Sequence, residues 1–294
     1  MKKYLSILLA VVLAFALAGC ASNVEKAPAE SAAADVNAKS EGVMTYAEYT
    51  AADLDSQVTI EAYVQAKQSW WENQATVYTQ DADGAYFLYN MVCSEEDYAK
   101  LEKGTKIKVT GYKSEWSGEV EITDATFEIE EGSYVADAKD VTDLLGQDSL
   151  IDYQNQFVSF KGLTVEAADD TGAAYLYKWD GSGSEGDDLY FNVSKDGNTY
   201  TFTVESYLCG ADTDVYKAVK NLKVGDTVDL EGFLYWYEGV NPHITSVTVK
   251  KDLQHKKEQC AAGALLFFAF WARERVAGEA CGFYIPCPFF PSPS

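Results

Sequence analysis

The sequence is short of positive charge, and of arginine above all. Its 294 residues include 23 Lys or Arg and 46 Asp or Glu, which gives a formal charge of −23 at pH 7. Both arginines, Arg273 and Arg275, lie near the C-terminus. Proteins bind nucleic acid mainly through Lys and Arg that displace counterions from phosphates. The composition therefore argues against a nucleic-acid partner and against attraction to anionic lipid headgroups.

The sequence also lacks the short motifs that mark common enzymes. It contains no hydrolase elbow, phosphate-binding loop, zinc-ligand spacing or dinucleotide fingerprint. The two histidines, His243 and His255, form no convincing pair with a cysteine. We therefore predict no catalytic residue, no metal site and no cofactor. A glycan-active enzyme, which needs two carboxylates about 5–10 Å apart in a cleft, is kept as a third hypothesis.

The N-terminus has the pattern of an export signal. Lysines at positions 2 and 3 precede an apolar run over 4–16, which is shorter than the ~20 residues of a membrane span. The run ends in Leu17-Ala18-Gly19-Cys20, which resembles the lipobox of bacterial lipoproteins. That resemblance implies a signal peptide over 1–19 and a lipidated Cys20, whose acyl chains hold the protein on the extracytoplasmic face of the cell membrane. The alternative is an ordinary secretory signal whose cleavage site contains a cysteine.

Two further segments differ in composition from the rest of the chain. Residues 20–42 are small and polar without hydrophobic periodicity, which is typical of a flexible tether. Residues 256–294 hold three of the six cysteines, four of the six prolines and all the arginine. We interpret them as an atypical tail, disordered or artefactual. The apolar run at 261–272 is too short to span a membrane.

Between tether and tail the sequence contains a degenerate repeat. Each copy has an alternating strand between two glycines seven residues apart, Gly104 and Gly111 in the first and Gly225 and Gly232 in the second. A helix with a capping pattern is predicted just before each of these strands, starting near 94 and near 212. A hairpin and another strand follow in both copies. The two copies therefore agree in the order of their elements.

The order of strands in each copy points to one fold. Strands are predicted at 57–60, 75–79 and 85–91 in the first copy, and at 156–159, 173–179 and 189–193 in the second, with an added strand at 199–206. Three strands, a helix and two strands resemble the OB-fold, a five-stranded Greek-key barrel. We therefore predict an all-β chain with tandem OB-like domains at 43–131 and 132–255. The alternative is a β-sandwich.

Aromatic residues are the candidate ligand contacts. OB-folds bind ligands on strands two and three and in the loops between strands one and two and between strands four and five. Aromatic rings beside Asp, Glu and Asn can stack on sugars and accept hydrogen bonds from hydroxyls. They could equally form cross-strand pairs or pack between the barrels. The residues predicted to bind a ligand are Trp70, Trp71, Tyr86, Trp116, Tyr177, Trp179, Trp236 and Tyr237.

Two other patterns leave alternatives open. The acidic segments 81–84 and 180–188 offer closely spaced oxygens for calcium, yet neither forms a complete EF-hand loop, and a strand-connecting turn explains both. Cys93 and Cys209 each lie just before the helix of their copy and could pair or remain buried thiols.

The function predicted from these observations is a non-enzymatic, membrane-anchored lipoprotein that binds a glycan or a protein through aromatic residues on its barrels. A structural or assembly scaffold of the cell envelope is the second hypothesis.

Overall fold

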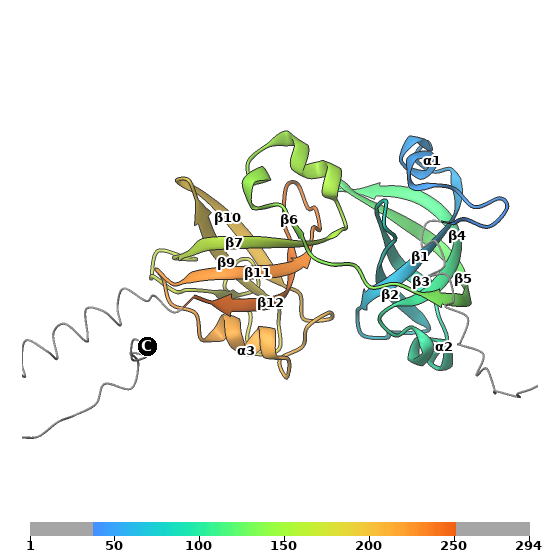
Figure 1. Ribbon diagram of the computed structural model, residues 1–294. Helices are drawn as coiled ribbons and strands as arrows, with labels where there is room; N and C mark the ends of the chain where they lie inside the picture. Colours follow the sequence, from blue (N-terminus) through green and yellow to red (C-terminus); the bar gives the residue numbers. More distant parts are fainter. Residues whose placement is uncertain (1–37, 251–294) are drawn as a thin grey trace, which may run out of the picture. The chain divides into compact units, whose positions relative to one another are not determined.

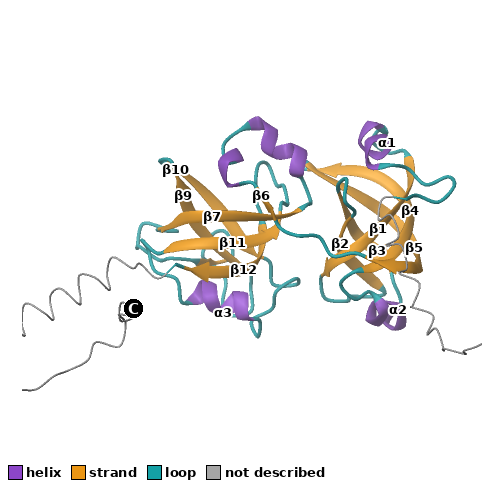
Figure 2. Cartoon of the chain, viewed as in Figure 1, coloured by secondary structure: helices purple, strands orange, loops and turns teal. Residues whose placement is uncertain are grey.

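The computed structural model describes residues 38–250 (Figures 1 and 2). The predicted signal segment 1–19, Cys20, most of the tether and the tail 256–294 lie outside the described residues. Within 38–250, no helix is both long enough and apolar enough to cross a membrane. Strands dominate and form two barrels in succession, so the chain is all-β as predicted.

The first barrel contains five strands and two short helices. Its elements are α1 (Tyr46–Ala51), β1 (Gln57–Lys67), β2 (Gln74–Gln80), β3 (Ala85–Val92), α2 (Glu95–Lys100), β4 (Thr105–Trp116) and β5 (Glu119–Ser133). The strands hydrogen-bond in the closed order β1-β2-β3-β5-β4. Only the β3–β5 pair is parallel among these strands, with Phe87 opposite Glu121 and Leu88 opposite Ile122. Side chains that alternate along the strands, such as Ile107 and Val109 of β4, fill the interior.

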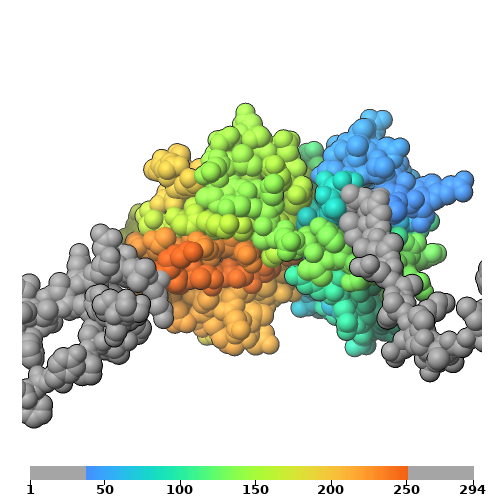
Figure 3. Space-filling view, viewed as in Figure 1, coloured from blue at the N-terminus to red at the C-terminus, as the bar shows by residue number. Residues whose placement is uncertain are grey.

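The second barrel repeats this architecture with additions. Its elements are β6 (Lys139–Asp140), η1 (Thr142–Leu144), η2 (Asp148–Tyr153), β7 (Phe157–Glu166), β8 (Leu176–Tyr177), β9 (Leu189–Lys195), β10 (Asn198–Val204), α3 (Asp214–Lys220), β11 (Thr227–Phe233) and β12 (His243–Val249). The sheet runs β7-β11-β12-β10-β9, and a β7–β9 pairing closes it into a ring. Phe160, Phe191 and Phe202 are fully buried in its core. In the space-filling view α3 lies at the surface beside β12 (Figure 3).

Both rings have the strand order of an OB-fold, with a helix between the third and fourth strands. The predicted tandem OB-like fold is therefore confirmed, and the β-sandwich alternative is wrong because each sheet closes on itself. The capping patterns are present too: the Ser94 side chain accepts from the Asp97 N–H at α2, and Thr213 accepts from the Tyr216 N–H at α3.

The repeated glycines at the ends of the two predicted strands mark barrel corners. The β4–β5 register shifts at Gly111 and the β11–β12 register shifts at Gly232. A Cβ at Gly111 would lie 2.6 Å from Ile122 Cγ2, and one at Gly232 would lie 2.2 Å from the His243 carbonyl oxygen. Close approach of a second strand therefore requires glycine at both positions.

The strand assignment for the second copy was partly wrong. The predicted strand at 173–179 is reduced to β8, a two-residue strand outside the closed ring that pairs with β9. The second and third barrel strands are β9 and β10, so the segment regarded as an added strand is an integral one. The aromatic alternation of 173–179 is typical of a strand, but only two of its residues pair with β9, and within the ring β9 pairs with β7 and β10.

Aromatic side chains pack between the barrels. Tyr78 and Phe87 of the first barrel and Phe233 of the second form one buried cluster, in which the Tyr78 and Phe233 rings stack with centroids 4.3 Å apart. The Tyr78 hydroxyl lies 2.6 Å from His243 Nδ1 of β12. Both barrels therefore contribute to one continuous interior at this point.

Candidate ligand-binding groove

A groove of about 940 Å³ is lined by residues of both barrels. The first barrel contributes the β1–β2 loop, β2, β3 and the end of β4. The second contributes β9, β10 and the β11–β12 loop. These are the strands and loops with which OB-folds contact ligands, and here the two sets share a single concave surface. Its volume is in the range of small-molecule and short-oligomer sites.

Exposed aromatic rings dominate the groove. Trp179 is 75% exposed and Trp71 67% exposed, although burial is the usual state of rings this large. An exposed aromatic patch of this kind is typical of an interaction site rather than of a core. The groove aromatics that are at least 43% exposed are Trp71, Tyr89, Trp116, Trp179, Tyr207 and Tyr237.

Four of the eight residues predicted to contact a ligand line this groove. Trp71 comes from the β1–β2 loop and Trp179 from the segment after β8, while Trp116 and Tyr237 come from the equivalent loops between the last two strands of each barrel. The Trp116 and Tyr237 ring centroids are 5.0 Å apart. Each residue lies five positions after a repeated glycine, Gly111 or Gly232, so the two rings occupy equivalent places in the last hairpins of the two barrels.

The other four predicted contacts do not line the groove. Tyr86 is fully buried in the first core, and its hydroxyl donates to Asp81. Trp70 is half-buried and donates its Nε1–H to the Cys93 carbonyl. Trp236 is also half-buried, and Tyr177 packs edge-on against Tyr175. Trp70 and Trp71 are neighbours in sequence with separate environments: Trp71 pairs with Gln74 across the turn at Glu72 and Asn73, whereas Trp70 precedes that turn.

Several groove residues were absent from the predicted set. Tyr89 and the following Asn90 are both exposed, because the β2–β3 register shifts between Ala75 and Val77, near the left-handed Asn90 with φ 48°. Strand alternation alone places successive residues on opposite faces, so it could not predict this pair. Tyr207 follows the end of β10 and has no equivalent in the first copy.

The groove carries no positive side chain among its described lining residues. Three carboxylates, Asp188, Glu205 and Glu238, line it, and none of the ion pairs formed within 38–250 includes them. Glu205 accepts hydrogen bonds from the backbone N–H groups of Tyr207 and Leu208 at 3.2 and 2.8 Å. Burial, and then the nearby Asp188, raise the pKa of Glu205 to about 7.

A buried imidazole lies in the wall beside these acids. Burial lowers the pKa of His243 to about 3, so the ring is neutral at physiological pH. Its ring stacks on Tyr235 with centroids 4.2 Å apart and its Nδ1 faces the Tyr78 hydroxyl. His243 therefore adds a neutral polar edge to the groove and no positive charge.

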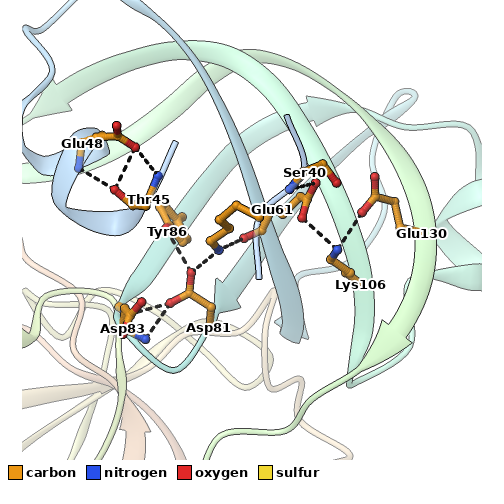
Figure 4. A network of polar contacts seen from close by, with 11 residues as sticks. Ser40, Thr45, Glu48, Glu61, Asp81, Asp83, Tyr86, Lys106 and Glu130 are labelled. Carbon is orange, nitrogen blue, oxygen red and sulfur yellow. Dashed lines mark hydrogen bonds and ion pairs between the residues drawn. The ribbon is translucent and has the colours of Figure 1, made fainter. Parts of the chain in front are cut away.

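The carboxylates of the two acidic turns already accept hydrogen bonds from groups of the protein itself. Asp81 Oδ1 accepts from the Asp83 and Gly84 N–H groups, and Oδ2 lies 2.6 Å from Lys39 Nζ (Figure 4). In the second turn Asp180 accepts from the Ser182 N–H. Across the described residues, no cluster of three His, Cys, Asp or Glu is arranged to hold a metal ion. The turn interpretation accounts for both segments.

Cys93 and Cys209 are both buried and free, so the two cysteines do not pair. Burial raises the pKa of each thiol to about 11, which leaves both protonated at neutral pH.

Comparison with known proteins identifies neither a family nor a ligand for this chain. No family model matches the chain, and no curated protein matches it. Similar solved structures include a murine DNA binding protein bound with ds DNA, at 12% identity, 66% of this chain, 97% of that chain and a TM-score of 0.33. Another is a deletion mutant of the single-stranded DNA binding protein from Thermus aquaticus, at 14% identity, 67% of this chain, 94% of that chain and a TM-score of 0.24. A third is the Ifi202 HINa domain in complex with 20bp dsDNA, at 11% identity, 66% of this chain, 98% of that chain and a TM-score of 0.30.

Proposed function

We propose that this protein is a non-enzymatic binding module that takes an uncharged oligosaccharide in the aromatic groove. The observation that carries the proposal is the row of six exposed aromatic rings on one concave surface. Aromatic faces stack on the apolar faces of sugar rings, and side chains such as Asn90 and Asn241 can exchange hydrogen bonds with hydroxyl groups.

Charge selects among possible ligands. A phosphate chain entering the groove would meet three carboxylates and no compensating cation, in a molecule with a formal charge of −23. Nucleic-acid binding depends on cations in the site, so a DNA or RNA ligand is disfavoured. A neutral glycan carries no such penalty.

The lipobox-like segment at the N-terminus supports a proposal for where the module is located. We propose that Cys20 carries acyl chains that anchor the protein to the extracytoplasmic face of the membrane, with the segment up to 42 as a tether. The proposal rests on the order of residues 17–20 and on the preceding apolar run. An anchored, exported module is then placed to meet glycans of the envelope or its surroundings.

The test is a calorimetric titration of the full-length protein with neutral oligosaccharides of four to six units. Tyr89→Ala removes a ring from the groove, whereas Tyr112→Ala removes an equally exposed ring, 45% against 44%, that lies outside it. We expect Tyr89→Ala to weaken binding about ten-fold and Tyr112→Ala to leave it unchanged, because one stacking contact contributes roughly 1–1.5 kcal/mol.

Three other outcomes would redirect the proposal. Equal losses of affinity in both variants would show that the oligosaccharide does not bind in the groove. No binding to any glycan would favour the scaffold hypothesis, in which the partner is a protein. The aromatic packing between the barrels is a second observation that favours this hypothesis. Release of new reducing ends, abolished by Glu205→Gln, would favour a glycan-active enzyme that uses the Asp188 and Glu205 carboxylates.

A further inference from the structure

Two neighbouring residues of β3, Tyr89 and Asn90, both face the groove because a β-bulge interrupts the β2–β3 pairing. The register shifts so that a single residue of β2, Thr76, lies opposite both of them. Leu88 and Met91, on either side of the pair, are fully buried in the core. A regular strand would direct one of the two neighbours into the barrel, whereas a bulge re-aims it outward.

The Thr76 hydroxyl forms two hydrogen bonds with Asn90. Thr76 Oγ1 accepts from the Asn90 backbone N–H at 3.1 Å and donates to Asn90 Oδ1 at 3.3 Å. Thr76 is buried, so its hydroxyl hydrogen needs an acceptor within the protein, and Asn90 Oδ1 supplies it. The two bonds hold Asn90 at φ 48°, in the left-handed region that asparagine adopts more readily than most residues.

These bonds determine what the Asn90 amide offers to a ligand. Because Oδ1 accepts from Thr76, the amide orientation is fixed and Nδ2 is the end that remains. Within residues 38–250, Asn90 Nδ2 forms no hydrogen bond. Nδ2 carries two N–H groups and can only donate. The exposed Tyr89 ring and a pair of N–H donors therefore belong to adjacent residues on the groove surface.

We propose that Asn90 contacts the ligand by donating from Nδ2 to an oxygen of the bound oligosaccharide, and that Thr76 is the positioning residue that orients Asn90. The inference rests on the groove being the binding site of the proposed function. A sugar unit that stacks on Tyr89 carries hydroxyl and ring oxygens around its rim, and these are the acceptors that the Asn90 donors suit. Thr76 acts through Asn90, since both hydrogen-bonding functions of its hydroxyl are used within the protein.

The first test removes the amide and keeps the backbone. Glycine adopts a positive φ without strain, so Asn90→Gly preserves the bulge and loses both Nδ2 donors. We expect the oligosaccharide affinity of the full-length protein, measured by calorimetric titration, to fall about ten-fold. Unchanged affinity in this variant, with the unsubstituted protein binding the same oligosaccharide, would overturn the Asn90 contact.

The second test removes the positioning hydroxyl. Thr76→Val keeps the shape of the side chain and loses both bonds to Asn90, whereas Thr76→Ser keeps the hydroxyl. We expect Thr76→Val to lower the affinity about five-fold and Thr76→Ser to restore most of it. Thr59→Val is the control, because it breaks a 3.0 Å bond to Thr110 on the same barrel outside the groove. Equal losses in Thr76→Val and Thr59→Val would overturn the positioning role.

A double-mutant cycle shows whether Thr76 acts through Asn90. In the Asn90→Gly background there is no amide to orient, and the backbone takes a positive φ without help from the hydroxyl. Thr76→Val should therefore cost little further affinity in that background, so the two losses are not additive. Additive losses would mean that Thr76 affects binding by another route, which contradicts the inference.

A readout without ligand keeps this inference distinct from the proposed function. A residue with positive φ shows a strong nuclear Overhauser effect between its own amide and α protons, so NMR reports the backbone of Asn90 directly. We expect a strong effect in the unsubstituted protein and in Thr76→Ser, and a weak one in Thr76→Val. A strong effect in Thr76→Val would overturn the positioning role whether or not glycans bind. The expected NMR pattern without binding of any oligosaccharide would instead refute the proposed function and the Asn90 contact.

Discussion

The buried carboxylates of this protein form two groups that differ in how their charge is compensated. Asp81 and Glu61 of the first barrel each contact a lysine: Asp81 lies 2.6 Å from Lys39, and Glu61 lies 2.8 Å from Lys106 (Figure 4). Burial opposes ionisation of Glu61, but the hydrogen bonds with Lys106 and Ser40 outweigh it and lower its pKa. Glu119 and Glu205 have backbone and amide donors but no cation. The compensated acids stabilise a barrel, and the uncompensated ones lie in or beside the groove.

Removal of the Asp81 carboxylate tests the first group. Asp81→Ala leaves the Lys39 ammonium without its ion-pair partner and frees two backbone N–H groups of the β2–β3 turn. We expect a loss of about 3 kcal/mol in the free energy of unfolding, measured by urea denaturation. Asp83→Ala, an exposed acid in the same turn, is the control and should cost less than about 0.5 kcal/mol. Similar losses in the two variants would show that turn propensity, not the ion pair, matters here.

At the scale of elements, the repeated unit is a strand that must approach its neighbour at a glycine. β4 and β11 reach the barrel corner through Gly111 and Gly232, where the register with the last strand shifts. Each helix before these strands begins at a side-chain cap, which fixes where the chain leaves the third strand. The groove is lined both by strands of the two barrels and by the loops that join them.

The variant Gly232→Ala tests how closely β11 and β12 pack at the barrel corner. Its Cβ would lie 2.2 Å from the His243 carbonyl oxygen, which belongs to a strand that cannot withdraw without breaking the β11–β12 ladder. We expect a loss of about 2 kcal/mol or more in unfolding free energy by urea denaturation. Gly210→Ala is the control, since its nearest contact is a side-chain oxygen of Asp212 at 3.3 Å. A tolerated Gly232→Ala would mean that the barrel corner is less tightly packed than described.

For the whole molecule, charge and attachment act together. The strongly acidic composition repels anionic headgroups, so electrostatic attraction does not hold this protein at a membrane. In the proposed location, anchoring is therefore assigned to acyl chains, since a basic patch is not there to replace one of them. The proposed location therefore depends on one residue, Cys20.

Cys20→Ser tests the location. Expressed with its full N-terminus in a bacterium, the unsubstituted protein should incorporate a radiolabelled fatty acid and sediment with membranes. The Cys20→Ser variant should take up no label and appear in the soluble fraction, because serine offers no thiol for acylation. The variants Cys93→Ser and Cys209→Ser control for loss of a cysteine as such, and labelling that survives Cys20→Ser would contradict the lipobox assignment.

The sequence predicted the fold through features that depend on local chemistry. Glycine spacing, strand alternation and helix caps recur in both copies, so the strand order was legible without a structure. The error at 173–179 arose because an aromatic alternating segment satisfies the same pattern whether or not it joins the ring. Only Leu176 and Tyr177 of this segment pair with β9, which belongs to the ring through its pairings with β7 and β10.

The residues of the groove also fall into two sets, those that the sequence could predict and those that it could not. Trp116 and Tyr237 could be predicted from their spacing to the repeated glycines, since hairpin geometry fixes where a residue falls. The burial of Tyr86, the outward turn of Tyr89 and the meeting of two hairpins at Glu119 depend on contacts between residues far apart in the chain. The sequence by itself determined the repeated barrels and the acidic charge. The tertiary structure alone decided which rings face solvent and which buried carboxylates contact a lysine, because both depend on what surrounds a side chain in space.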